Sequence, residues 1–251
     1  MPSLRTLNSS VTPPKVGAPT KTFFVQYNQT AHQNGGCCCL WTVPVGVTRV
    51  TFEMWGAGGD GSGGFCCESS AMGAISGAYS IKQIDSIAGR QYRLCAAGSG
   101  CCTYCYDIGN TGSPSYVYGI TEGAVIACAA GGCGGNNSPT RYGSGEGYTC
   151  CWGRYTDTCG IGDISFPGAG GTGIRNQYCH SNTYHIVASG PLSGGGRASP
   201  DRCSLWACNG YYVMKSDAAF PGGPGGDPNV CGGGMCYGQY GQGGMIKVSY
   251  S

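Results

Sequence analysis

The sequence contains few charged residues. Asp, Glu, Lys and Arg make up 10% of the 251 residues, and the formal net charge is +2, whereas about 25% charged residues is usual in soluble domains. Because nucleic-acid binding depends on concentrated positive charge, we expect no nucleic-acid partner. No apolar run approaches the roughly 18 residues that a membrane-spanning helix needs, so we also expect no membrane insertion.

The large apolar residues that usually form a core are scarce as well. Leu, Ile, Val and Phe account for about 15% of the chain, below the roughly 20% under which a chain struggles to offset its ordering entropy. Disorder would also require a high net charge, which this sequence lacks. The 19 Cys and 17 Tyr residues supply buried surface of another kind. We therefore expect a folded protein with a small conventional core.

Catalytic signatures are missing too. The 12 carboxylates are scattered, without a pair that resembles the acid and base of a glycosidase. The three histidines have no obvious nucleophile beside them. Residues Gly56–Gly61 match G-x-G-x-x-G, but the sequence that follows cannot begin the helix that would bind a pyrophosphate. We predict a non-enzymatic protein with no cofactor and no metal.

What the sequence does contain is a series of short strand patterns. In Val47–Trp55, the apolar residues Val50, Phe52 and Met54 alternate with polar ones, which is typical of a half-buried strand. Met245–Tyr250 shows the same alternation. No window shows a helical period with caps. Many short strands between turn-forming residues predict an all-β protein, an antiparallel β-sandwich or jelly-roll-like core with long glycine- and cysteine-rich loops. Weaker strand candidates are Phe23–Tyr27, Cys39–Val43, Ala78–Ile84, Tyr92–Ala96, Val117–Gly119, Ala124–Ala129, His185–Ala188 and Tyr211–Met214.

Composition divides the chain into two parts. Residues 1–21 are proline-rich and without periodicity, so we interpret them as an extended N-terminal arm that either docks on a partner, with Leu4, Leu7 and Val11 as anchors, or is disordered. Residues 22–251 form a glycine- and cysteine-rich β domain. Its glycine tracts are either floppy linkers or polyproline-II-like segments in close contact, and Pro221–Gly226 is the best candidate for the second alternative.

The cysteines favour a network of disulfides. Consecutive Cα atoms lie about 3.8 Å apart, whereas a disulfide usually joins Cα atoms about 4.4–6.8 Å apart, so adjacent cysteines should reach different segments. Buried reduced thiols are one alternative, and a zinc site using spacings such as Cys102-x2-Cys105 is another. The odd total leaves one thiol free or bonded between chains. The disulfide candidates are Cys37, Cys38, Cys39, Cys66, Cys67, Cys95, Cys101, Cys102, Cys105, Cys128, Cys133, Cys150, Cys151, Cys159, Cys179, Cys203, Cys208, Cys231 and Cys236.

One stretch is more specific than any of these patterns. Residues Trp41–Gly59, with Val-Pro-Val-Gly-Val before a strand and Gly-Ala-Gly-Gly after it, resemble the opening of the glycine-rich domain of bacteriophage tail proteins. Gly77–Ser80 resembles the second strand entry of that family, and Gly241–Tyr250 its closing glycine run and strand. This chain differs from the family in its many cysteines and tyrosines.

The resemblance implies a virion protein, made in the host cytoplasm because the chain begins without an apolar secretory stretch. It implies a homotrimeric tail-fibre or tail-tip adhesin that contacts host cell-surface polysaccharide and other virion proteins, the latter through residues 1–21. The alternative is a purely structural virion component, such as a capsid decoration or tail connector protein.

The inserts between the strand patterns are rich in Tyr, Ser, Gly and Asn, which are common in binding surfaces. Their aromatic residues either contact the ligand or pack over disulfides and fill core space. The ligand-contact candidates are Tyr104, Tyr106, Trp152, Tyr155, Tyr178, Tyr211 and Tyr212.

Overall fold

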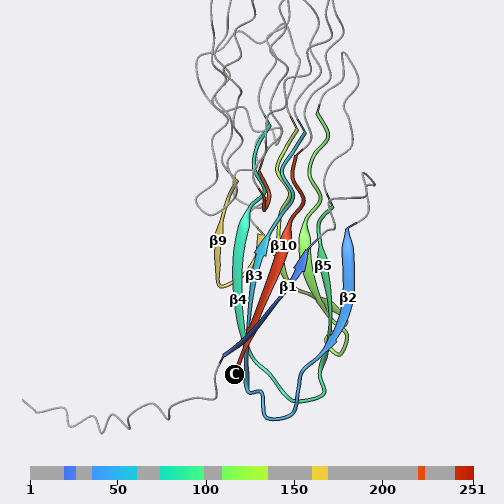
Figure 1. Cartoon of the computed structure of the whole chain (residues 1–251), viewed down its shortest axis with the longest axis vertical. Helices are drawn as coiled ribbons and strands as arrows, with labels where there is room; N and C mark the ends of the chain where they lie inside the picture. The colour runs from blue at the N-terminus through green and yellow to red at the C-terminus, as the bar shows by residue number, and fades with distance from the viewer. Residues whose placement is uncertain are drawn as a thin grey trace, which may run out of the picture.

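The protein is an all-β sandwich of two antiparallel sheets (Figure 1). A computed structural model describes residues 20–26, 36–60, 74–98, 109–134, 160–168, 220–223 and 241–251. Within these ranges ten strands and no helix occur, so none of the described residues form a helix that could cross a membrane. The first sheet has the order β1 (Lys21–Gln26), β10 (Met245–Tyr250), β3 (Arg49–Trp55), β4 (Tyr79–Asp85) and β9 (Ile164–Phe166). The second has the order β2 (Cys37–Thr42), β5 (Gln91–Ala96), β6 (Ser115–Gly119), β7 (Ala124–Ala129) and β8 (Gly160–Ile161).

The core lies between the sheets and follows the alternation seen in the sequence. Val50, Phe52 and Met54 of β3 are fully buried, because every second side chain of a strand points to the same face. From the second sheet, Tyr92 and Leu94 of β5 pack against them, also fully buried. The predicted all-β fold is therefore confirmed, although the strand order does not establish the jelly-roll variant.

Most strand predictions are confirmed with small shifts at their ends. Both strong candidates and six of the weaker ones correspond to described strands. The remaining two, His185–Ala188 and Tyr211–Met214, lie outside the described residues. The short strands β8 and β9 were not predicted, because two or three residues are too few to show an alternating pattern. β1 begins at Lys21, the last residue assigned to the N-terminal arm, and residues 1–19 lie outside the described ranges.

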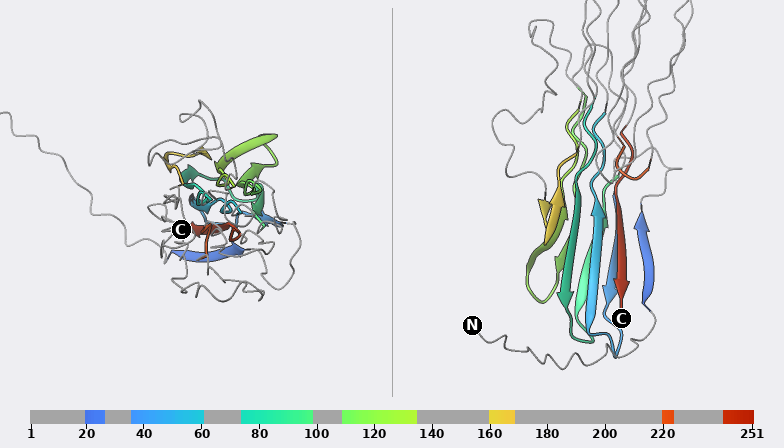
Figure 2. Two further views of the ribbon diagram at one scale, coloured as in Figure 1. Left: turned by 90° about the horizontal axis from the view of Figure 1, so that it is seen from above. Right: turned by 90° about the vertical axis from the view of Figure 1, so that its left-hand side faces the viewer.

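Successive strands run in opposite directions along one axis (Figure 2). At the end that carries the C-terminus, which we call the base, tight turns join the strands at residues 43–48, 86–90 and 120–123. At the other end the chain continues beyond the strands in extended segments. We call these segments the glycine bundle, and number them first (56–60), second (74–78), third (109–113), fourth (130–134), fifth (220–223) and sixth (241–244).

Backbone hydrogen bonds hold the glycine bundle together with a repeat of three residues. Gly56 and Gly59 donate their N–H groups to carbonyls of the second segment, at 2.9 Å each. The residue after each of them, Ala57 or Asp60, donates to the third segment, and Gly58 donates to the sixth. A polyproline-II helix has three residues per turn and no internal hydrogen bonds. The three-residue repeat of the first segment fits this geometry, and its N–H groups donate to three neighbouring segments.

Glycine is required in this bundle because the backbones are in contact. A Cβ atom added to Gly56 or Gly59 would overlap a carbonyl oxygen of the fourth segment. One added to Gly131 or Gly134 would overlap the third segment in the same way. The predicted close contact between glycine segments is thus confirmed, and the three-residue repeat of the first segment fits the polyproline-II-like alternative. For Pro221–Gly226, the segment named as the best polyproline-II candidate, the prediction is wrong at Gly222, because φ there is 70°, outside the polyproline-II region.

Candidate functional site

The end of the molecule formed by the glycine bundle carries the long inserts. Six stretches of chain, which we call the inserts, leave and rejoin the described structure there: residues 27–35, 61–73, 99–108, 135–159, 169–219 and 224–240. At the base, by contrast, the turns that join strands are short. All seven aromatic ligand-contact candidates belong to three of the inserts and so lie outside the described residues. The fold therefore brings the ends of these inserts to one side of the sandwich.

Asp60 is the titratable residue at the point where the inserts begin. It ends the first bundle segment, and only 1% of its surface is exposed. Its Oδ1 accepts a hydrogen bond of 2.8 Å from the Gly241 N–H, and its Oδ2 accepts one of 3.3 Å from Asn110 Nδ2. Asp60 precedes one insert, while Asn110 and Gly241 follow two others. The carboxylate therefore fixes the ends of three inserts relative to one another.

Burial makes the charge on Asp60 costly. It raises the pKa of Asp60 from 3.8 to about 6, and the hydrogen bonds from Gly241 and Asn110 offset only part of this rise. Within the six bundle segments Asp60 is the one charged side chain, and the Cys133 thiol is the one other titratable group. Backbone and amide dipoles, without a counter-cation from the bundle, stabilise the ionised carboxylate. Sequence reasoning missed this residue, because Asp60 and Gly241 are 181 positions apart.

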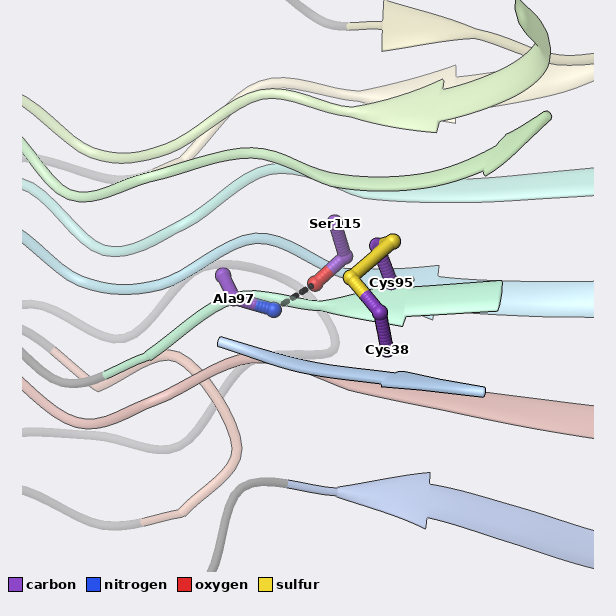
Figure 3. Close-up of a disulfide and its surroundings, with 4 residues drawn as sticks. All are labelled: Cys38, Cys95, Ala97 and Ser115. Atoms are coloured by element: carbon purple, nitrogen blue, oxygen red, sulfur yellow. Dashed lines mark hydrogen bonds between the residues drawn. A yellow bond between two sulfur atoms is a disulfide. The ribbon is translucent and has the colours of Figure 1, made fainter. Parts of the chain in front are cut away.

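A disulfide lies where the second sheet meets the glycine bundle (Figure 3). Cys38 of β2 and Cys95 of β5 are directly opposite in the register, with Cα atoms 4.1 Å apart. Beside it, Ser115 Oγ accepts a hydrogen bond of 3.0 Å from the Ala97 N–H and donates one of 2.6 Å to the Trp55 carbonyl. The bond from Ser115 to Trp55 connects the two sheets at the edge of the bundle.

The cysteine prediction is confirmed for this one pair. Cys38 bonds to a distant segment and not to its neighbours, as the geometry of adjacent cysteines requires. Cys37, Cys39 and Cys128 have free thiols, so a disulfide at each of them is not confirmed. Burial raises the pKa of the Cys39 and Cys128 thiols, which makes them less reactive. Cys133 is buried in the fourth bundle segment, and the other thirteen candidates lie outside the described residues.

A second group of side chains lies on the outer face of the first sheet. Tyr79 packs against Trp55 and Phe166, with ring centroids 5.0 and 6.4 Å away. Glu53 Oε2 accepts a hydrogen bond of 3.1 Å from the Tyr79 hydroxyl, and Lys247 Nζ lies 2.6 Å from its Oε1. Burial and the Glu53 carboxylate raise the pKa of Tyr79. Tyr79 itself is almost fully buried, whereas Phe166 is 39% exposed.

The described residues provide no cluster of metal-ligating side chains. Within the described ranges, His, Cys, Asp and Glu side chains do not gather in groups of three that could hold a metal ion. What the geometry provides is a rigid platform, formed by the glycine bundle with Asp60 at its end, from which the inserts extend. A scan against protein-family models and a search of curated proteins found no match to this chain.

Proposed function

We propose that this chain is a bacteriophage tail-fibre or tail-tip adhesin that binds host-surface polysaccharide through its inserts. The observation that carries the proposal is the collection of six inserts at one end of a sandwich whose opposite end has short turns. A binding protein gains affinity when its contact residues extend from a rigid scaffold, because less ordering entropy is lost on binding. The glycine bundle, with its dense backbone hydrogen bonds, is such a scaffold.

The opening and closing motifs that resemble the phage tail family, Trp41–Gly59 and Gly241–Tyr250, also support the proposal. The opening motif forms a turn, with Gly46 at φ 88° and the Val47 N–H donating to the Pro44 carbonyl, followed by strand β3. The closing glycine run leads into β10, and β3 and β10 are hydrogen-bonded neighbours. Motifs separated by about 200 residues therefore form one local unit.

The inserts have a composition suited to glycans. Tyr and Trp provide rigid, amphipathic rings, and Ser, Asn and Gly provide adaptable hydrogen bonds. With few charged residues in the chain, recognition would depend on stacking and neutral hydrogen bonds. That chemistry fits a polysaccharide better than a polyanion.

Binding of the purified, oxidised full chain to an array of bacterial capsular and lipopolysaccharide O-chains tests the proposal. The variant Tyr104→Ala/Tyr106→Ala removes two insert rings. Its matched control, Tyr116→Ala/Tyr118→Ala, removes two tyrosines of the same spacing from β6 of the sandwich.

We expect at least one polysaccharide to bind, and the insert variant to weaken that binding about tenfold or more, equivalent to about 1.4 kcal/mol. The control should change it less than about twofold. If the folded, oxidised chain binds no polysaccharide, or if both variants weaken binding equally, the adhesin proposal is wrong. The purely structural virion component would then be the better assignment.

A further inference from the structure

The base of the sandwich presents three aliphatic side chains on three neighbouring turns. Val45, in the turn at residues 43–48, is 94% exposed, and Ile87, in the turn at 86–90, is 64% exposed. Ile120, in the third turn, is 39% exposed. We call these three residues the base patch. Turns usually carry Gly, Pro, Asn, Asp or Ser, whereas all three of these turns carry an exposed aliphatic residue.

The three turns are bonded to one another. The Val43 N–H donates to the Arg90 carbonyl at 2.8 Å, and the Gly89 N–H donates to the Val43 carbonyl at 2.9 Å. The Ile120 N–H donates to the Gln91 carbonyl at 3.0 Å. The base patch is therefore held in a fixed arrangement, and a partner that covers it would not have to order the turns first.

Two arginines near the base patch each have an acidic partner. Arg90 Nη1 lies 3.0 Å from Glu122 Oε1, and Arg49 Nε lies 3.8 Å from Asp85 Oδ1. Binding to nucleic acid or an anionic lipid surface depends on unpaired basic residues, and these two arginines are not available for it. The base patch therefore fits an apolar protein segment.

The N-terminal arm has the chemistry and the position of such a segment. β1 begins at Lys21, opposite Tyr250, so the chain enters the sandwich at the base. The arm is proline-rich and carries the apolar residues Leu4, Leu7 and Val11, which are suited to an aliphatic surface. At about 3.1 Å per residue, the stretch from Val11 to Thr20 can span about 28 Å, enough to reach a neighbouring molecule.

We propose that the base patch binds the N-terminal arm, residues 1–19, of a second copy of this chain, so that copies associate by exchanging arms at their bases. In the single chain Val45 is almost fully exposed, so the site is open to another molecule. The inference concerns assembly and does not rest on glycan binding, and its test has a separate readout.

Sedimentation equilibrium of full-length variants tests this arm exchange. One variant, Leu4→Ser/Leu7→Ser, alters the arm, and a second, Val45→Ser/Ile87→Ser, alters the base patch. Leu40→Ser is the matched control, because Leu40 is 60% exposed but belongs to β2, away from the base turns. All the altered side chains of the sandwich are exposed, so the variants should fold.

We expect the unmodified chain and the control to be oligomeric, and the arm and base variants each to dissociate at least about tenfold more readily. An equimolar mixture of the two variants should associate more tightly than either variant alone, because each mixed pair has one contact between an intact arm and an intact base. A monomeric unmodified chain would overturn the inference. So would oligomers that persist in the base variant, or a mixture that associates no more tightly than either variant alone.

Discussion

Asp60 makes the stability of this protein depend on pH in an unusual direction. Its pKa is about 6 in the folded protein, compared with 3.8 for an aspartate that is not buried. Because the folded-state value is raised, the folded protein takes up a proton at higher pH than the unfolded chain does. Stability should therefore increase as the pH falls through about 6, whereas carboxylates whose pKa is lowered by ion pairs or hydrogen bonds weaken a fold on acidification.

The magnitude follows from the size of the shift. A difference of about two pKa units corresponds to about 3 kcal/mol between the fully ionised and fully protonated limits. Between about pH 7.5 and about pH 4.5, roughly 2 kcal/mol of this should appear. Asp163 does not interfere, because its hydrogen bonds from Lys82 Nζ and the Gln83 N–H lower its pKa below this range.

Guanidinium unfolding at both pH values, followed by tryptophan fluorescence, measures the effect. Asp60→Asn keeps the shape and removes the titration, so subtracting its pH dependence from that of the unmodified chain cancels the histidines and other groups. We expect the difference in unfolding free energy between the two proteins to change by about 2 kcal/mol, with the Asn variant relatively more stable at neutral pH. A constant difference at the two pH values, or a change of opposite sign, would refute the reasoning.

Two further perturbations test the scaffold. Gly59→Ala should lower the unfolding free energy by roughly 3–5 kcal/mol in a denaturant titration, because the added Cβ would overlap the Cys133 carbonyl and separate hydrogen-bonded segments. Gly46→Ala, which meets no atom within 4 Å and adds only the strain of φ 88°, should cost about 1–2 kcal/mol, and equal losses would contradict the contact explanation. Cys38→Ser/Cys95→Ser removes a disulfide between residues 57 positions apart and should cost about 2–4 kcal/mol. Unfolding curves that stay unchanged in this variant, or in the unmodified chain after reduction, would show that the bond does not stabilise the fold.

Local patterns in the sequence were enough to predict the fold class and every described strand except the short β8 and β9. In β3 and β10, apolar and polar residues alternate within six or seven positions, and this alternation alone decides which face is buried. The turn at residues 43–48 could also be predicted from the sequence, because its proline and glycine have strong backbone preferences. Such signals persist whatever the rest of the chain does.

The contacts that define the candidate site depended on segments distant in the sequence. Nothing near Asp60 indicates that Gly241 will bond to its carboxylate, and nothing in the triplet Cys37–Cys39 indicates that its middle residue pairs with Cys95. Likewise, the sequence of a glycine tract fits a flexible linker as well as a packed segment, and only the backbone contacts in the structure distinguish the two. The sequence determined the strands because their periodicity is local, whereas only the tertiary structure decided the bundle, the buried carboxylate and the disulfide, because each requires backbones from different parts of the chain to meet.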